Sequence, residues 1–551
     1  MPSERGGIER GWWRQGVVYQ VYPRSFADAD GDGTGDVAGI RSRLGYLADL
    51  GVDAIWISPW YPSPLNDGGY DVADYRDIDP RFGTLADAEA MLADAHALGI
   101  GVIVDIVPNH TSSEHRWFQA ALAAEPGSPE RARYWFRPGR GPDGSEPPTN
   151  WNSVFGGPAW SRVPDGEWYL HLFDATQPDL NWENPEVREE FDDIFRFWID
   201  RHVEGFRIDV AHSLAKDPAL PDLEAGTDLL GSTTIDEHPH WDRDDVHEII
   251  RRWRRVIDEA SDGYAMMVAE AWVSPDRRPM YLRPDEYHQS FNFDLLETPW
   301  TATGFRGAIR DAYDAAEAVG STNTWTLSNH DVMRHATRLG LPDGTNWRRW
   351  LLDGPHELLD VELGARRARA ASMLLLALPG SVYIYQGEEL GLPEVWDLPP
   401  EVLDDPAWEN SGHTVKGRDG CRVPMPWTPD GPSFGFGAGG AWLPQPAVYG
   451  ELAASTQAGD PSSSLELYRT ALRVRRERLI GDESLEWLDG DASGDADDVL
   501  AFRRGSGVIC MTNFGADPVS IPDGVVLLSS SPPEDQAILP GDTTVWLAPA
   551  E

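Results

Sequence analysis

The stretch "VIVDIVP", residues 102–108, is a run of β-branched residues that ends at a proline, which indicates a β-strand. Further short runs of this kind alternate with amphipathic helical stretches along most of the chain. The eight predicted strands cover residues 17–23, 54–60, 102–108, 205–211, 266–272, 288–294, 324–331 and 381–389. Eight strand–helix repeats predict an α/β fold, a (β/α)8 TIM barrel.

Two insertions interrupt the strand–helix alternation. Residues 109–178, after the third strand, are rich in Gly, Pro and Trp and lack a helical period, which predicts an inserted subdomain. A second insertion of about residues 387–462 follows the eighth strand. Beyond 480, alternating apolar residues and turn signals predict a C-terminal β-sandwich domain over 481–551. The barrel itself is predicted to comprise residues 1–108 and 179–480.

Composition excludes several classes of partner. The 551 residues carry 46 basic and 91 acidic side chains, a net charge of −45, which argues against binding nucleic acid or anionic membranes. The first residues contain no apolar run typical of a secretory signal, and no apolar run is long enough to span a bilayer. Two cysteines, Cys421 and Cys510, cannot form a disulfide framework, which favours a cytoplasmic protein. Separately, we expect a monomer or weak homodimer that needs no organic cofactor.

Polar residues collect where the predicted strands end, which is where barrels of this type place their active sites. These residues are Asp105, Asn109, His110, Arg207, Asp209, Glu270, His330 and Asp331. Acids gathered on one rim repel one another and shift each other's pKa, so they need a chemical reason to be there. A pair of carboxylates is the equipment for glycoside hydrolysis, and a separation of about 5–5.5 Å gives retention through a covalent intermediate.

Two of these acids have settings suited to different roles. Arg207 lies two residues before Asp209 on the same strand face, and its charge is expected to keep Asp209 ionised, as a nucleophile must be. Glu270 lies between two alanines with Trp272 next, an apolar setting expected to raise its pKa, as a general acid needs. Each acid alone is compatible with a salt bridge or a helix cap. Together, in barrel order, they favour catalysis.

Five motifs give the chain a family resemblance. They are "DIVPNH" (105–110), "QPDLNW" (177–182), "GFRIDVAH" (205–212), "VAEAW" (268–272) and "TLSNHD" (326–331). In this order they resemble the signature regions of the α-amylase superfamily, glycoside hydrolase family 13. The "QPDLNW" form is similar to the α-glucosidase and oligo-1,6-glucosidase branch. The resemblance covers the whole chain and implies a retaining, exo-acting α-glucosidase that releases terminal glucose from short oligosaccharides.

The resemblance also implies residue roles. Asp209 would be the nucleophile, Glu270 the acid/base, and Asp331 a third carboxylate that grips sugar hydroxyls and stabilises the transition state. Asp67 and Arg422 would close the end of the pocket as a charge pair, so that only a terminal glucose enters. The full set of implied substrate-binding residues is Asp67, Tyr70, His110, Phe173, Gln177, Arg207, Val210, His330 and Arg422.

Linkage preference and the fate of the glucosyl group stay open. Val210 resembles the residue found in α-1,6-cleaving members, but "AHSLAKDPALPD" (211–222) does not match the pattern expected of them. Both maltose-type and isomaltose-type substrates therefore remain, as do glucosyl transfer and conversion of sucrose or trehalose. A non-enzymatic alternative is a relative of the transporter-associated heavy subunits. Those carry a membrane helix and some have lost catalytic acids, whereas this sequence keeps all three.

The stretch "DADGDGTGD", residues 28–36, places like charges close together among glycines. A hard cation such as Ca²⁺ would relieve their repulsion. The pattern matches the first half of an EF-hand loop, but Gly39 stands where the bidentate glutamate belongs. The family resemblance implies a structural Ca²⁺ site, with Mg²⁺ as the alternative ion; an acidic turn without metal is the alternative to both. The implied ligands are Asp28, Asp30, Asp32, Asp36 and the carbonyl of Thr34.

Overall fold

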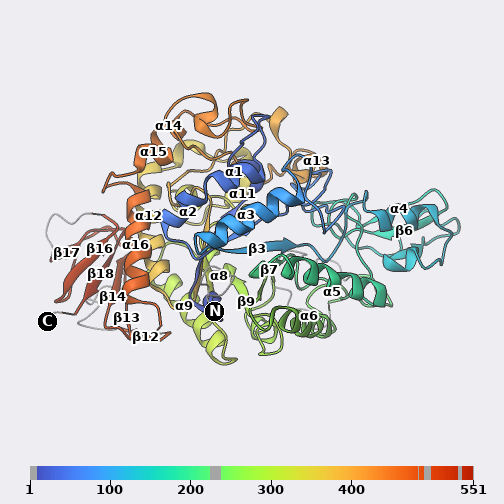
Figure 1. Ribbon diagram of the computed structural model, residues 1–551, viewed down its shortest axis with the longest axis horizontal. Helices are drawn as coiled ribbons and strands as arrows, with labels where there is room; N and C mark the ends of the chain where they lie inside the picture. Colours follow the sequence, from blue (N-terminus) through green and yellow to red (C-terminus); the bar gives the residue numbers. More distant parts are fainter. Residues whose placement is uncertain (1–8, 224–237, 482, 489–497, 532–536, 550–551) are drawn as a thin grey trace.

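The fold is organised around a closed barrel of eight parallel strands (Figure 1), in the computed structural model that describes residues 9–223, 238–481, 483–488, 498–531 and 537–549. Around the barrel the strand order is β1-β11-β10-β9-β8-β7-β3-β2. The strands are β1 Val17–Val21, β2 Ala54–Ile57, β3 Gly101–Ile106, β7 Gly205–Ile208, β8 Met266–Ala269, β9 Gln289–Asn292, β10 Thr324–Thr326 and β11 Ser381–Tyr385. The predicted TIM barrel is confirmed.

The strands end earlier than the sequence predicts. Strand β7 stops at Ile208 rather than at 211, and β8 stops at Ala269 rather than at 272. The two strands are parallel neighbours with Ile208 opposite Ala269. Asp209 and Glu270 therefore each follow directly after a strand, side by side at the carboxyl edge of the barrel.

Amphipathic helices surround the barrel. In α6 the buried residues Val246, Ile249, Ile250, Trp253 and Ile257 repeat at helical spacing and face the strands. No described helix is long and apolar enough to cross a bilayer. The longer helices are α3 Leu85–Ala97, α4 Arg116–Ala123, α5 Pro185–Ile199, α6 Val246–Ser261, α9 Ala302–Glu317, α12 Val361–Ala377 and α16 Ser464–Arg478. Shorter ones are α1 Val37–Ser42, α2 Leu44–Leu50, α7 Arg278–Tyr281, α8 Phe293–Glu297, α10 His335–Arg338, α11 Trp347–Asp353, α13 Pro406–Asn410, α14 Val448–Leu452 and α15 Ala454–Gln457.

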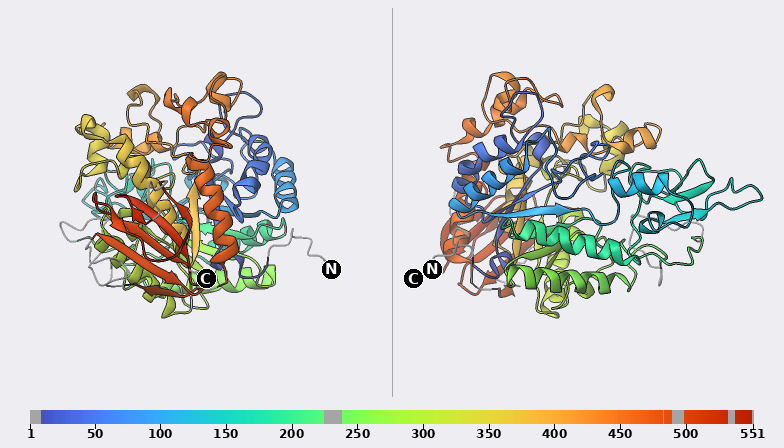
Figure 2. Two further views of the ribbon diagram at one scale, coloured as in Figure 1. Left: turned by 90° about the vertical axis from the view of Figure 1, so that its left-hand side faces the viewer. Right: turned by 45° about the vertical axis from the view of Figure 1, so that its right-hand side comes forward.

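A three-stranded antiparallel sheet lies in the chain between β3 and β7, within the predicted insertion. Its order is β4-β6-β5, with β4 Phe136–Pro138, β6 Glu167–Leu170 and β5 Trp160–Arg162. Trp135, Trp151 and Trp160 form its small core. The subdomain projects from the barrel at one end of the molecule, as the views in Figures 1 and 2 agree. Its loops border the carboxyl ends of the strands, since Phe173 packs against His110, which follows β3.

The C-terminal residues form antiparallel sheets at the opposite end of the long axis (Figure 1). One has the order β12-β13-β14-β18-β16, and β15 pairs with β17. Trp546 of β18 donates its indole N–H to the carbonyl of Met373 in α12 at 3.1 Å, which fixes this sheet to the barrel. The strands are β12 Leu485–Trp487, β13 Val499–Arg504, β14 Ile509–Asn513, β15 Val519–Ser520, β16 Val525–Ser529, β17 Ile538–Leu539 and β18 Thr543–Ala548. The predicted all-β character of this part is confirmed.

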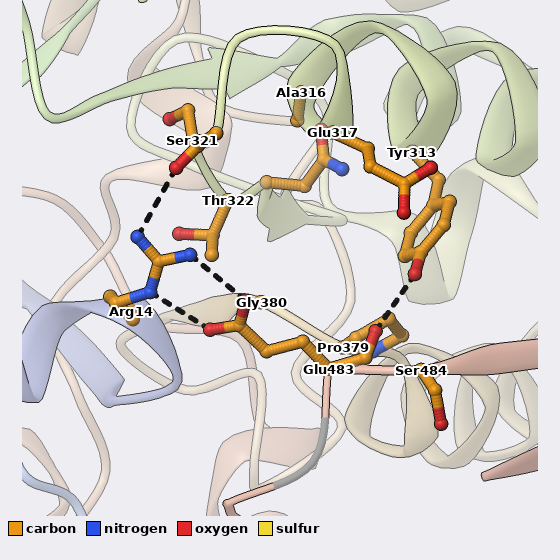
Figure 3. A pocket seen from close by; sticks show the side chains of 12 residues that line it. Arg14, Tyr313, Ala316, Glu317, Ser321, Thr322, Pro379, Gly380, Glu483 and Ser484 are labelled. Carbon is orange, nitrogen blue, oxygen red and sulfur yellow. Dashed lines mark hydrogen bonds and ion pairs between the residues drawn. The ribbon is translucent and has the colours of Figure 1, made fainter. Parts of the chain in front are cut away.

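A cavity of about 310 Å³ lies where the barrel meets the C-terminal domain (Figure 3). Arg14 donates from Nε and Nη2 to the two carboxylate oxygens of Glu483, both at 2.9 Å, and Tyr313 donates to the Glu483 carbonyl at 3.0 Å. Asn323 and Gly380, which precede β10 and β11, also line it. The cavity is therefore at the amino ends of the strands, away from the predicted active site, and its polar groups serve the domain junction.

Candidate active site

Arg207, on β7, gathers three acids from neighbouring strands. Its Nη1 lies 2.9 Å from Asp105 Oδ1 and 2.5 Å from Asp209 Oδ1, and its Nη2 lies 2.8 Å from Glu270 Oε2. All four side chains are buried or nearly so. One guanidinium therefore brings both predicted catalytic carboxylates together, as attack by one and protonation by the other require.

Three carboxyl groups on one guanidinium leave an excess of negative charge. Burial raises the pKa of Asp105 to about 7, with Arg207 opposing and Glu270 adding to the shift. Burial also raises the pKa of Asp209 well above its usual range; Arg207 again opposes, and the charges of Glu270 and Asp105 reinforce. Arg207 thus favours the ionised form of Asp209, as predicted from the sequence, but burial and the neighbouring acids oppose it. Since these acids interact, their protons are shared by the cluster, and a nucleophile and a general acid together need one proton between them.

The surroundings of Glu270 are more polar than its alanine neighbours predict. Its Oε2 accepts from Arg207 and, at 3.1 Å, from the backbone N–H of Val210. Its Oε1 accepts from the indole N–H of Trp272 at 3.0 Å. The carboxyl group is thus held at both oxygens. These donors come from the neighbouring strand and from its own loop, so the apolar setting expected from the sequence is incorrect.

Val210, next to the predicted nucleophile, has an unusual backbone. Its φ is +45°, in the left-handed region that β-branched residues rarely occupy. This conformation turns the chain directly after β7, so that Val210 N–H meets Glu270 while the side chain stays buried. Backbone strain of this kind occurs where a site needs an atom in a fixed place.

The ion pair expected between Asp67 and Arg422 is not formed. Asp67 pairs instead with Arg418, whose Nη2 lies 2.6 Å from Asp67 Oδ1. Arg422 binds Asp331, with Nη2 3.0 Å from Oδ1, and Arg418 Nη1 lies 3.1 Å from the same oxygen. Arg418 also pairs with buried Asp405. Arg418 was not among the residues predicted from the sequence, although it lies four residues before Arg422 in the same loop.

These arginines control the charge of Asp331. Burial alone would raise the pKa of Asp331, but the charges of Arg418 and Arg422 hold it below its usual range. His330 is itself kept neutral, because burial lowers its pKa well below the ordinary value. Asp331 is thus an anion beside a neutral imidazole, able to accept hydrogen bonds from sugar hydroxyls.

The two histidines hold other predicted residues in place. His330 Nε2 lies 2.6 Å from the Tyr70 hydroxyl, and the two rings stack with centroids 5.2 Å apart. His110 Nε2 lies 3.0 Å from Gln177 Nε2, which also donates to Asp67 Oδ2 at 3.0 Å. Burial lowers the pKa of His110 to about 4, so it is neutral at pH 7. Every one of these side chains is buried.

Two inserted segments meet beside this cluster. The ring of Phe173 lies 5.1 Å from that of His110 and 6.0 Å from that of Phe155, both distances between centroids. Asn410 donates to Asp174 Oδ2 at 2.7 Å, which joins the second insertion to the first. The subdomain and the second insertion therefore contact each other beside the site.

A buried lysine binds residues next to His110. Lys216 Nζ lies 2.7 Å from Asp179 Oδ2 and donates to Asn109 Oδ1 at 2.8 Å. Asn109 in turn faces His110, with its Nδ2 3.2 Å from Nδ1. Lys216 and Lys416 are the only lysines in the sequence, which was the available signal for Lys216.

The acidic loop after β1 partly assembles the predicted metal site. Asp28, Asp30 and Asp36 each offer a carboxylate oxygen, and these oxygens lie within 4.8 Å of one another. Asp32 is outside this group, and the carbonyl of Thr34 stays a prediction. Burial raises the pKa of Asp28, and backbone N–H groups of the loop oppose this. A set of clustered carboxylates fits a hard cation.

A closed barrel that carries a buried carboxylate pair and a third acid at the carboxyl ends of its strands is typical of glycoside hydrolases. The family model for the alpha amylase catalytic domain matches residues 20–482. The chain belongs to the alpha-amylase family.

Relatives within this family have several activities. The chain is 38% identical to a probable alpha-glucosidase of Rhizobium meliloti, over 92% of this chain and 90% of that protein. It is 36% identical to an oligo-1,6-glucosidase of Parageobacillus thermoglucosidasius, over 86% and 85%. The crystal structure of the alpha-glucosyl transfer enzyme XgtA superposes with a TM-score of 0.84 at 36% identity, covering 98% of this chain and 99% of that one.

Proposed function

We propose that the protein is a retaining, exo-acting α-glucosidase that releases terminal α-D-glucose from short oligosaccharides. The observation that carries the proposal is the single guanidinium of Arg207, which binds both Asp209 and Glu270. Its relatives named alpha-glucosidase and oligo-1,6-glucosidase support the substrate class.

In the proposed reaction, a carboxylate oxygen of Asp209 attacks the anomeric carbon of the terminal glucose. Glu270 gives its proton to the glycosidic oxygen as that bond breaks, which leaves a glucosyl ester on Asp209. Glu270, now ionised, then takes a proton from water, and the resulting hydroxide displaces Asp209 to give α-glucose. Asp331 remains an anion throughout and accepts hydrogen bonds from the sugar.

Exo action is inferred from the ion pair between Asp67 and Arg418. Both side chains are largely buried, and Arg418 links Asp67 to Asp331 across the pocket. Gln177 reinforces the same wall by donating to Asp67. A wall of this kind leaves space for a terminal sugar and stops a longer chain from passing through.

Glucosyl transfer is a second candidate, favoured by the likeness to an alpha-glucosyl transfer enzyme. The covalent intermediate is the same, and a sugar hydroxyl replaces water in the second step. Conversion of sucrose or trehalose would also proceed through the covalent glucosyl intermediate. Initial rates and products on maltose, isomaltose, sucrose and trehalose separate these activities.

We also infer a structural Ca²⁺, or alternatively Mg²⁺, at Asp28, Asp30 and Asp36, because these acids converge without a described arginine or lysine on any of them. The ion would neutralise the loop that follows β1. It has no part in the proposed chemistry.

The decisive experiment replaces the nucleophile. Asp209→Asn should lower kcat at least about 10³-fold on the best disaccharide, while the thermal midpoint Tm changes little. A 5-fluoroglucosyl fluoride should label the wild-type peptide that contains Asp209, as mass spectrometry would show. Asp217→Asn, in the loop further along, is the matched control and should keep full activity. Unchanged turnover in Asp209→Asn would refute the proposal.

A further inference from the structure

Trp272 touches the predicted acid/base in a way that the proposed mechanism has not used. It lies two residues after Glu270 in the loop that follows β8, and its Nε1 donates to Glu270 Oε1 at 3.0 Å. Its ring lies flat on Phe293 of α8, with centroids 4.1 Å apart and planes inclined by 10°. Its carbonyl accepts from the indole of Trp241 at 3.3 Å. The half-buried indole is therefore held in one orientation.

The two oxygens of Glu270 have different partners. Oε2 accepts from the charged Nη2 of Arg207 at 2.8 Å and from Val210 N–H at 3.1 Å. A proton on Oε2 would have to displace one of these donors. Oε1 accepts the indole N–H at 3.0 Å, and the Glu270 carboxyl group also lies within hydrogen-bonding distance of Asp209. Because Oε2 already accepts from two donors, Oε1 is the oxygen better placed to carry the proton that the proposed mechanism requires, and the indole N–H fixes the orientation of that oxygen.

We propose that Trp272 is a positioning residue that orients Oε1 of Glu270 toward the glycosidic oxygen, and that its indole borders the space taken by the leaving group. The inference rests on the proposed role of Glu270 as acid/base. The residue would act on proton transfer and not on the attack by Asp209, because its indole N–H contacts Glu270 and not Asp209.

This role has a signature that a purely structural role lacks. A sugar leaving group departs as a poor alkoxide and needs the proton, whereas p-nitrophenolate departs with little help. Misdirecting the proton therefore slows disaccharide hydrolysis and spares the aryl glucoside. A general loosening of the site would slow both.

The test is Trp272→Phe, which keeps an aromatic ring on Phe293 and removes the N–H. We expect kcat/KM on the better of maltose and isomaltose to fall about 10- to 100-fold, and on p-nitrophenyl α-glucoside less than about threefold. The basic limb of the pH–rate profile should move to higher pH, because loss of a donor favours the protonated carboxyl group. Trp347→Phe, in the same apolar cluster, is the matched control and should change neither substrate.

Equal losses on both substrates, or an unchanged disaccharide rate, would overturn the inference. Glu270→Gln separates this failure from that of the proposed function. If Glu270→Gln keeps disaccharide hydrolysis, the proposed function itself fails. If it shows the dependence on leaving group and Trp272→Phe does not, only the role of Trp272 fails. Should Trp272→Phe not fold, Phe293→Leu, which keeps the indole N–H but removes its support, must show the same selectivity in weaker form.

Discussion

At the scale of single residues, the site depends on contacts that reach across strands. Arg207 binds acids that are 102, 2 and 63 residues away in the sequence. Val210 adopts a strained backbone so that its N–H can reach the same cluster. The chemistry of each acid is therefore determined by its partners more than by its neighbours in sequence.

Val210 offers a prediction about linkage. Its side chain is buried beside Asp209, so shortening it enlarges the pocket near the bond to be cleaved. Val210→Ala should shift the ratio of kcat/KM for isomaltose to that for maltose toward maltose, by about 1–3 kcal/mol, or roughly 5- to 150-fold. Initial rates on the two disaccharides measure the ratio. An unchanged ratio would show that linkage preference lies elsewhere in the pocket.

At the scale of elements, two connections join barrel strands to the surrounding helices. One is the acidic loop between β1 and α1, where Asp36 also caps α1 by accepting from Gly39 N–H. The other is the end of β11, where buried Glu388 accepts from the hydroxyl of Tyr468 in α16 at 2.9 Å. Each connection places carboxyl groups, which can carry negative charge, at the end of a strand or the start of a helix.

The acidic loop predicts a response to metal removal. Treatment with EDTA should lower Tm by several degrees, and excess Ca²⁺ should restore it, since an ion bound only by the folded protein stabilises it. Differential scanning calorimetry measures both steps. Asp30→Asn should weaken the response, while Asp217→Asn leaves it intact. No change in Tm with either reagent would contradict a bound ion.

Glu388 predicts a dependence of stability on pH. Burial raises its pKa to about 8, against an ordinary value of 4.5, despite hydrogen bonds from Tyr468 and the Tyr385 N–H that oppose the shift. A raised pKa in the folded state contributes stability that is complete below pH 4.5 and is lost as the pH rises to about 8. Glu388→Gln keeps an acceptor for Tyr468 and should remove this part of the slope. Urea unfolding between pH 5 and 8 compares the two proteins, and parallel slopes would contradict the prediction.

Elements were more predictable from sequence than the site was. The barrel strands could be predicted because each is a short apolar run of β-branched residues between turn signals. Their ends could not, because polar residues such as Asp209 and Glu270 continue the pattern after the ladder has stopped. The pairing of Asp67 with Arg418 rather than Arg422 depends on how the loop within 387–462 folds across the barrel, which spacing does not reveal. The polar environment of Glu270 was missed because its donors come from β7 and from the turn at Val210.

At the scale of the whole molecule, the barrel separates two functions. Its carboxyl end carries the site, beside which two insertions meet at Asp174 and Asn410. Its amino end carries the junction with the C-terminal domain, secured by Arg14 and Glu483. Changes at one end need not disturb the other.

The net charge of −45 predicts a response to salt. Repulsion among surface acids opposes compaction, and added ions screen it over a Debye length that falls from about 30 Å at 0.01 M to about 3 Å at 1 M. Tm should therefore rise with NaCl over this range. Thermal unfolding followed by circular dichroism measures the change. A falling Tm would mean that the ion pairs bridging elements contribute more than the repulsion costs.

The guanidinium shared by three acids also limits which substitutions the active site can tolerate one at a time. Replacing Arg207 would strand three buried carboxyl groups at once, so no single compensating change at 105, 209 or 270 could restore the balance. Asp105 is bound into the same arrangement although it has no role in bond breaking. A change at Arg207 during evolution would require simultaneous changes at several of these positions. We therefore expect the catalytic reaction to be more resistant to mutation than the substrate specificity.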